Sequence, residues 1–134
     1  MAMTGGCLCG GVRYEIRGSF GVAAICHCSM CRKQSGSAFL VAAPIETKDF
    51  SWTKGEDLLV RYPSSVGGAR IFCKTCGSTL AGGPADPGLG MLWIMFGSLD
   101  GDSGVKPSAH IFVGSKAPWF EITDGLPQFQ EFPG

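Results

Sequence analysis

Three thiols and one imidazole lie within a single run of six residues, Cys26-His27-Cys28-Ser29-Met30-Cys31. Soft sulfur ligands at this density are typical of a zinc site and do not suit magnesium or calcium. Three cysteine ligands leave one coordination position for water or substrate, which is the pattern of a catalytic zinc. An exchangeable position beside thiolate ligands also suits a thiol substrate. One alternative is that the thiols bind no metal and one of them is a free nucleophile.

His27 is the obvious candidate for a fourth ligand, which would close this site. Neighbouring residues of an extended chain point in opposite directions. If Cys26 and Cys28 converge on one ion, His27 therefore points away from it. We expect His27 to support the site from outside the ligand set or to lie at the surface.

The other four cysteines form two pairs far apart in the sequence, Cys7-Leu8-Cys9 and Cys73-Lys74-Thr75-Cys76. Each pair has an alternative interpretation: buried thiols in a turn for the first, and a redox motif for the second. The residues around the second pair resemble strands and not the βαβ setting of redox motifs, which favours metal. We predict that Cys7, Cys9, Cys73 and Cys76 together hold a structural zinc with no open position.

Alternating polar and apolar residues predict a mainly β protein. Val12, Tyr14 and Ile16 would face one side of a strand, with charged residues between them. Further strands are expected at residues 22–25, 38–45, 58–62, 69–73, 91–96 and 110–113. Pro63 should end the strand at 58–62, residues 82–90 should form a loop, and the apolar strand at 91–96, including Trp93, should be buried on both faces.

One short helical turn is expected directly after Cys28. Ser29 is a plausible N-cap, and Gly36 suits the C-terminal end of the turn. Cys26 and Cys28 would then lie at a strand end and Cys31 on the first turn. We found no internal repeat or linker, so we expect one domain over residues 1–134.

The composition excludes several classes of protein. Eleven basic residues balance eleven acidic residues, which argues against a general nucleic-acid or acidic-membrane binder. No apolar run is long enough to span a bilayer. The N-terminal residues do not resemble a signal peptide. Seven cysteines without such a signal suggest reduced, metal-binding thiols and a cytoplasmic location.

The chain resembles the glutathione-dependent formaldehyde-activating enzyme family, which includes centromere protein V relatives. The matching segments are GCLCGGVRY at residues 6–14, CHCSMCRK at 26–33 followed by GSAF at 36–39, FCKTCGS at 72–78, and PSAHI at 107–111 followed by Trp119. The resemblance implies a β-tent fold of mainly antiparallel strands. It also implies two zinc ions with the four-plus-three division of cysteines reached above.

The resemblance further implies a carbon–sulfur lyase that acts on glutathione conjugates, for example one that joins glutathione and formaldehyde to S-hydroxymethylglutathione. Arg32 and Lys33 adjoin Cys31 and could bind the carboxylates of glutathione, although they could equally form a solvated helix face. Arg61 and Arg70 could also lie nearby. His27, Asp100 and His110 are conceivable proton donors or acceptors, and the sequence assigns none of them.

Two other functions compete with catalysis. The first is a zinc-stabilised module that binds glutathione or another small thiol without turnover. The second is a thiol cluster that senses redox state or formaldehyde. The sequence leaves open the physiological substrate, the direction of reaction and the oligomeric state.

Overall fold

The structure is a computed structural model that describes residues 2–84 and 90–133. The strands are β1 (Met3–Gly6), β2 (Arg13–Ile16), β3 (Ala24–Cys26), β4 (Leu40–Glu46), β5 (Phe50–Lys54), β6 (Leu59–Ser65), β7 (Gly68–Cys73), β8 (Thr79–Pro84), β9 (Met91–Met95) and β10 (Ala109–Ile111). Short 3-10 turns lie at Thr47–Asp49, Glu56–Leu58, Phe96–Ser98 and Val113–Ser115. The single α-helix of these ranges, α1, spans Ser29–Ser35. The prediction of a mainly β protein with one short helical turn is confirmed.

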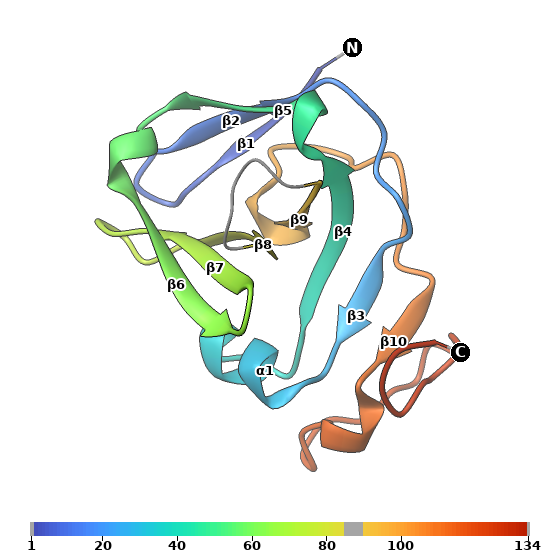
Figure 1. The fold of residues 1–134 in the computed structure, drawn as a ribbon. Coiled ribbons are helices and arrows are strands. Elements are labelled where there is room, and N and C mark those ends of the chain that lie inside the picture. The colour runs from blue at the N-terminus through green and yellow to red at the C-terminus, as the bar shows by residue number, and fades with distance from the viewer. Residues whose placement is uncertain (1, 85–89, 134) are drawn as a thin grey trace.

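The strands form two sheets. A small sheet has the order β1-β2-β5, and a larger one has the order β10-β3-β4-β9-β8-β7-β6. The small sheet crosses the top of the larger one, whose two wings spread downward on either side of α1 (Figure 1). The pairing is antiparallel except between β10 and β3, which run parallel. The sequence did not indicate this parallel pair.

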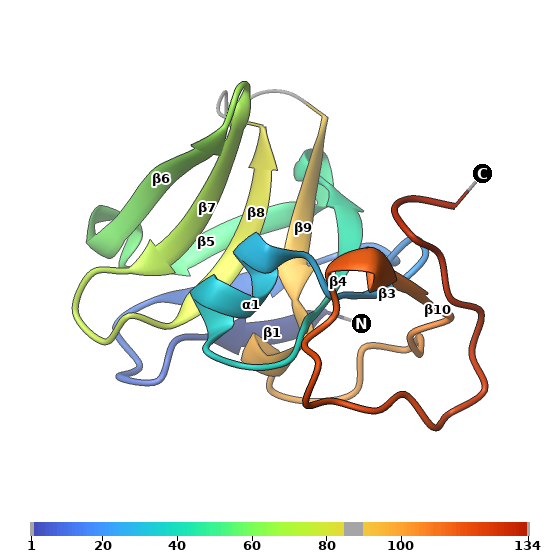
Figure 2. The ribbon, with the colours of Figure 1, turned by 90° about the horizontal axis from the view of Figure 1, so that it is seen from below.

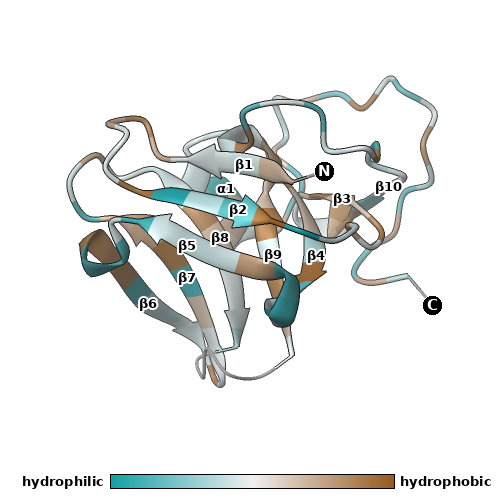
Figure 3. Ribbon diagram, turned by 90° about the horizontal axis from the view of Figure 1, so that it is seen from above, coloured by the Kyte–Doolittle hydropathy of each residue, from teal (hydrophilic) through white to brown (hydrophobic). Residues whose placement is uncertain are grey.

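The main core lies between the two sheets. Val12, Tyr14 and Ile16 all lie on one face of β2 and are buried, as the alternation predicted. They belong to the same apolar cluster as Ile45 of β4 and Ile94 of β9. The hydropathy colouring shows brown segments where β2 crosses the larger sheet (Figure 3). This arrangement leaves the lower side of the large sheet, around α1, available for a site.

Three predictions about the strands were wrong. β6 continues through Pro63 to Ser65, because β6 is the last strand of its sheet and its pairing with β7 is irregular between Tyr62 and Ser65; an edge position tolerates the missing N–H. Residues 82–84 of the predicted loop belong to β8, whereas residues 85–89 lie outside the described residues. β9 is not buried on both faces, since Trp93 is 39% exposed.

The C-terminal segment lies beside β10. His110 forms a parallel bridge to Gln128, and the Phe129 amide donates to the His110 carbonyl. The orange-red segment runs alongside β10 and away from the small sheet (Figure 2). Within the described residues, no helix has the length and apolar character needed to cross a bilayer.

Candidate metal and substrate site

The four predicted structural cysteines meet at one point. Cys7 and Cys9 lie in the connection from β1 to β2, Cys73 ends β7, and Cys76 lies in the connection to β8. Their sulfur atoms all lie within 4.8 Å of one another. The Cys7 and Cys9 sulfurs are 3.5 Å apart and those of Cys9 and Cys73 are 3.9 Å apart. A tetrahedral zinc with bonds of about 2.3 Å would place its sulfurs roughly 3.8 Å apart, so the cluster fits zinc.

Each pair is presented by a tight turn that ends in a glycine. The Gly10 amide donates to the Cys7 carbonyl, and the Gly77 amide donates to the Cys73 carbonyl. Gly10 and Gly77 each have φ of 77°, a left-handed conformation that favours glycine. The sequence therefore places a glycine directly after the second cysteine of each pair because the chain must turn away from the metal there.

Backbone and hydroxyl groups support the thiolate forms of Cys7 and Cys76. The Val12 amide lies 3.2 Å from the Cys7 sulfur. The Ser78 hydroxyl, followed by nearby backbone amides, lowers the pKa of Cys76 to about 5. Deprotonated thiols are the form that binds metal. This cluster is thus suited to an ion that joins the β1–β2 connection to the β7–β8 connection.

The three remaining cysteines form a second cluster at the start of α1. Cys26 ends β3, and Cys28 rather than the predicted Ser29 is the N-cap of α1, where its sulfur accepts from the Cys31 amide at 3.3 Å. The sulfurs of Cys26, Cys28 and Cys31 lie within 4.8 Å of one another, and His27 is not part of the group. Gly36, with φ of 65°, ends the helix as predicted. Three converging sulfurs can hold a metal ion that keeps one position open.

His27 points into the interior and not toward the sulfurs. Its Nε2 lies 2.8 Å from Nδ1 of His110, whose own Nε2 lies 2.9 Å from an Asp124 carboxylate oxygen. His27 and His110 are buried. Because a carboxylate only accepts hydrogen bonds, His110 donates from Nε2 and accepts at Nδ1 from His27. Burial, followed by the nearby His110 and Lys116, lowers the pKa of His27 and favours its neutral form.

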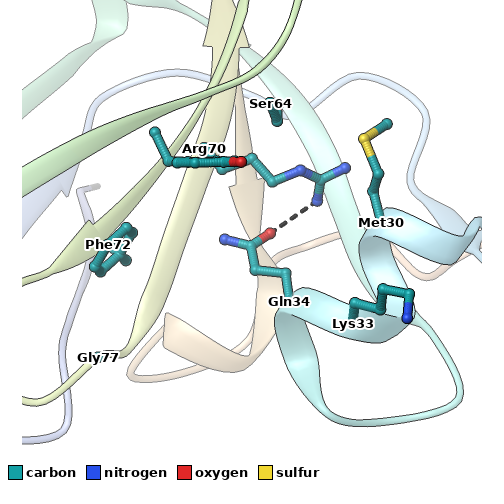
Figure 4. Close-up of a pocket in the computed structure, with 8 residues that line it drawn as sticks. Met30, Lys33, Gln34, Ser64, Arg70, Phe72 and Gly77 are labelled. Atoms are coloured by element: carbon teal, nitrogen blue, oxygen red, sulfur yellow. Dashed lines mark hydrogen bonds between the residues drawn. The ribbon is translucent and has the colours of Figure 1, made fainter.

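Arg70 of β7 approaches the three-cysteine cluster from the opposite wing of the sheet. Both of its terminal nitrogens lie 3.6 Å from the Cys31 sulfur. Nη1 also donates to Gln34 Oε1 at 2.8 Å (Figure 4), and the Gln34 amide donates to the Thr79 hydroxyl. Hydrogen bonds from Cys26 and Cys28, and then the Arg70 guanidinium, lower the pKa of Cys31 to about 5 despite its burial.

Two adjoining cavities open beside this cluster. One, of about 510 Å³, is lined by all three cysteines together with residues of β4, β9 and β10. The other, of about 630 Å³, is lined by α1 residues including Lys33 and Gln34 and by β6 and β7 residues (Figure 4). Met30, Ser64 and Arg70 line both. The cluster is therefore accessible to a small molecule that could extend into either cavity.

Comparison with known proteins agrees with this geometry. The sequence pattern of the glutathione-dependent formaldehyde-activating enzyme family matches residues 2–115. The chain belongs to this family. Its fold is accordingly the β-tent fold that the motifs implied, and both cysteine clusters are consistent with zinc.

Two relatives are informative. An uncharacterized lyase of Schizosaccharomyces pombe is 32% identical over 76 residues, which are 57% of this chain and 53% of that protein. The chain thus matches about half the length of this relative. The crystal structure of a Rhodobacter sphaeroides protein is 28% identical and superimposes with a TM-score of 0.60, covering 78% of this chain and 92% of that one.

The cationic residues that the sequence predicted near the three-cysteine cluster do not all lie beside it. Lys33 lines the cavity of about 630 Å³. Arg32 donates from Nε to the Ser115 carbonyl at 3.1 Å and is not among the residues that line either cavity. Arg61 lines a separate, smaller cavity with Trp52 and Met91.

Asp100 contacts residues of the small sheet and not the cysteines at α1. Its carboxylate pairs with Arg13 and accepts a hydrogen bond from the Thr4 hydroxyl. Arg70, which the sequence named only as a cation that could lie nearby, contacts the Cys31 sulfur. The sequence did not predict that His27, His110 and Asp124 form one hydrogen-bond chain. The one available signal for Arg70 was its place on the strand that leads into Cys73. No local signal pointed to Asp124.

Proposed function

We propose that the protein is a zinc-dependent carbon–sulfur lyase that acts on glutathione conjugates, such as the adduct of glutathione and formaldehyde. It would use two zinc ions in the cytoplasm, one closed by Cys7, Cys9, Cys73 and Cys76 and one open at the second cluster. The observation that carries the proposal is that Cys26, Cys28 and Cys31 converge at the wall of a cavity. A site closed by four ligands would have no such access.

A zinc ion bound by these three thiolates would supply Lewis acidity and an exchangeable position for a thiolate or an aldehyde oxygen. The protein's own residues would bind and orient the substrate. Arg70 holds a fixed orientation through Gln34 and offers a planar cation at the cavity wall, which suits a carboxylate. Its charge also favours an incoming thiolate beside Cys31.

The carboxylates of glutathione need further cations. Lys33 lines the cavity beside Arg70, so we propose that it binds one carboxylate. We also propose that Arg32, which precedes Lys33 on α1, contributes to carboxylate binding. Its guanidinium donates a hydrogen bond to the Ser115 carbonyl. Both roles can be separated by charge-neutral replacement, Lys33→Met and Arg32→Met, and measurement of KM for the glutathione part of the substrate.

The alternative is a module that binds glutathione without turnover. One observation favours it: the imidazole nearest to the open cluster, His27, donates to His110 in the interior and does not line either cavity. Proton transfer during a C–S step would then depend on solvent or on the substrate itself.

Turnover of the zinc-loaded protein with glutathione hemithioacetals and thioethers tests the proposal, with Cys28→Ser as the matched control. We expect activity in the wild type and its loss in a folded Cys28→Ser variant. Full activity in that variant would refute the mechanism. Calorimetric binding of glutathione without any turnover would support the non-catalytic module instead.

A further inference from the structure

The two cavities beside the open cluster differ in chemical character. The one of about 630 Å³ is lined by the cations Lys33 and Arg70 and the amide of Gln34, beside the rings of Tyr62 and Phe72. The one of about 510 Å³ has an apolar floor formed by neighbouring strands of the large sheet. Apart from Met30, which lines both cavities, its large apolar side chains are Leu40, Trp93, Met95, Ile111, Phe112 and Phe132.

A peptide thiol with two carboxylates can occupy only one of these cavities well. Apart from the cysteines, Arg70 is the single charged side chain among the described residues that line the apolar cavity, and it also lines the cationic cavity. A carboxylate placed on the apolar floor would lose its hydration without gaining a partner, which is costly. The peptide part of the substrate therefore belongs beside Lys33 and Arg70, and its sulfur beside the cysteines.

The group attached to the substrate sulfur then extends into the apolar cavity. The hydroxymethyl group of the formaldehyde adduct is far too small to fill a cavity of about 510 Å³. Trp93 and Met95 offer an aromatic face and an adaptable thioether, which suit a flexible or aromatic hydrocarbon. Trp93 is 39% exposed, and a substrate in this cavity would cover it.

The outer side of this cavity is built from two phenylalanines. Phe112 has φ of 57°, a left-handed conformation that is uncommon for a residue other than glycine. It directly follows β10 and its ring packs edge-on against Phe132 at 4.9 Å between centroids. The Phe112 amide donates to the Glu131 carbonyl, so the C-terminal segment is held at the cavity wall.

We propose that the preferred substrates are thiol adducts of apolar aldehydes, aromatic or with several carbons, and not the formaldehyde adduct. This proposal rests on the proposed function for the reaction. In the forward direction the thiol sulfur bonds to the carbonyl carbon, the C=O double bond becomes C–OH, and the thiol proton passes to that oxygen. The reverse direction breaks the C–S bond and returns the proton, with no oxidant or reductant involved.

Binding of unreactive thioethers tests the cavity without turnover. S-methyl-, S-butyl- and S-hexylglutathione would be titrated calorimetrically into the zinc-loaded protein. Each buried methylene should tighten binding about two- to fourfold. Equal affinity for the three, or tightest binding of the S-methyl compound, would overturn the proposal.

A matched pair of variants locates the effect. Trp93→Ala should weaken S-hexylglutathione binding about tenfold and leave S-methylglutathione within about twofold. Met91→Ala is the control, because Met91 lies on the same strand, is also exposed, and lines a separate cavity; it should change neither affinity. Equal loss in both variants would refute the assignment of Trp93.

The two proposals fail in different ways. If the thioether series shows the expected gain and no adduct is turned over, the apolar cavity stands and the catalytic function fails. If the formaldehyde adduct is turned over with a kcat/KM equal to that of a benzaldehyde or hexanal adduct, the catalytic function stands and the substrate preference is refuted.

Discussion

Replacing His110 with alanine should lower the melting temperature of the zinc-loaded protein by about 10 °C. His110 is 2% exposed and bonds His27 at 2.8 Å. Its removal would leave a buried His27 nitrogen without a partner, which costs about 1–3 kcal/mol. The void left by the imidazole, of the order of 50 Å³, would add roughly 1 kcal/mol. The destabilisation is therefore about 3 kcal/mol.

The conversion to temperature uses the length of the chain. The unfolding entropy is about 2.1 cal/mol/K per residue. For a chain of 134 residues, a loss of about 3 kcal/mol therefore lowers the melting temperature by about 10 °C. Differential scanning calorimetry would measure it, with zinc content determined in parallel so that metal loss is not mistaken for the effect. Ser108→Ala is the control, since its hydroxyl makes only a 3.4 Å contact to the Ala23 carbonyl.

The tautomer of His27 gives a second, independent readout. The hydrogen-bond chain requires the His27 proton on Nε2, which ¹⁵N NMR of the imidazole would report. His110→Ala should remove this preference. A melting temperature within about 3 °C of the wild type, with zinc content unchanged, would refute the predicted contribution of His110 to stability.

Three further predictions concern the metals and the core. Cys73→Ser should yield insoluble or unfolded protein, because Cys73 joins two connections through the four-sulfur cluster; a soluble variant with unchanged melting, measured by circular dichroism, would contradict this. A colorimetric chelator should release two zinc ions per chain in two phases, with the three-cysteine site emptied first; a single phase would contradict the open site. Burial, partly opposed by the Ser98 hydroxyl, raises the pKa of Tyr14 to about 12 from 10.0. The unfolded state therefore loses this proton first, so the free energy of unfolding falls as the pH rises from about 10 to about 12. Urea unfolding should show that Tyr14→Phe removes that fall.

The turns that present the cysteines were predictable because their information is local. Three thiols within one short run and a glycine after each pair describe the turns that present the ligands, and the structure has both glycines in the left-handed conformation. The junction of β3 and α1 also followed from local signals, including Gly36 at the helix end. Each of these features depends on residues a few positions apart.

The surroundings of the open cluster were not predictable in the same way. His110 reaches His27 only because β10 pairs in parallel with β3, and these residues are 83 positions apart. Trp93 was expected in the core, because the sequence of an apolar strand is the same whether its second face packs against protein or lines a cavity. The exposure of that face depends on how the two wings of the large sheet spread, which involves the whole chain.

The ends of the large sheet have a consequence for behaviour at high concentration. β6 carries Pro63, which has no N–H, within an irregular stretch of its pairing with β7. At the other end, the C-terminal segment pairs with β10 at His110 and Gln128. Unpaired strand edges are the usual template for aggregation between copies of a chain. A protein with seven cysteines and an apolar cavity beside three of them thus limits strand addition at both ends of its main sheet.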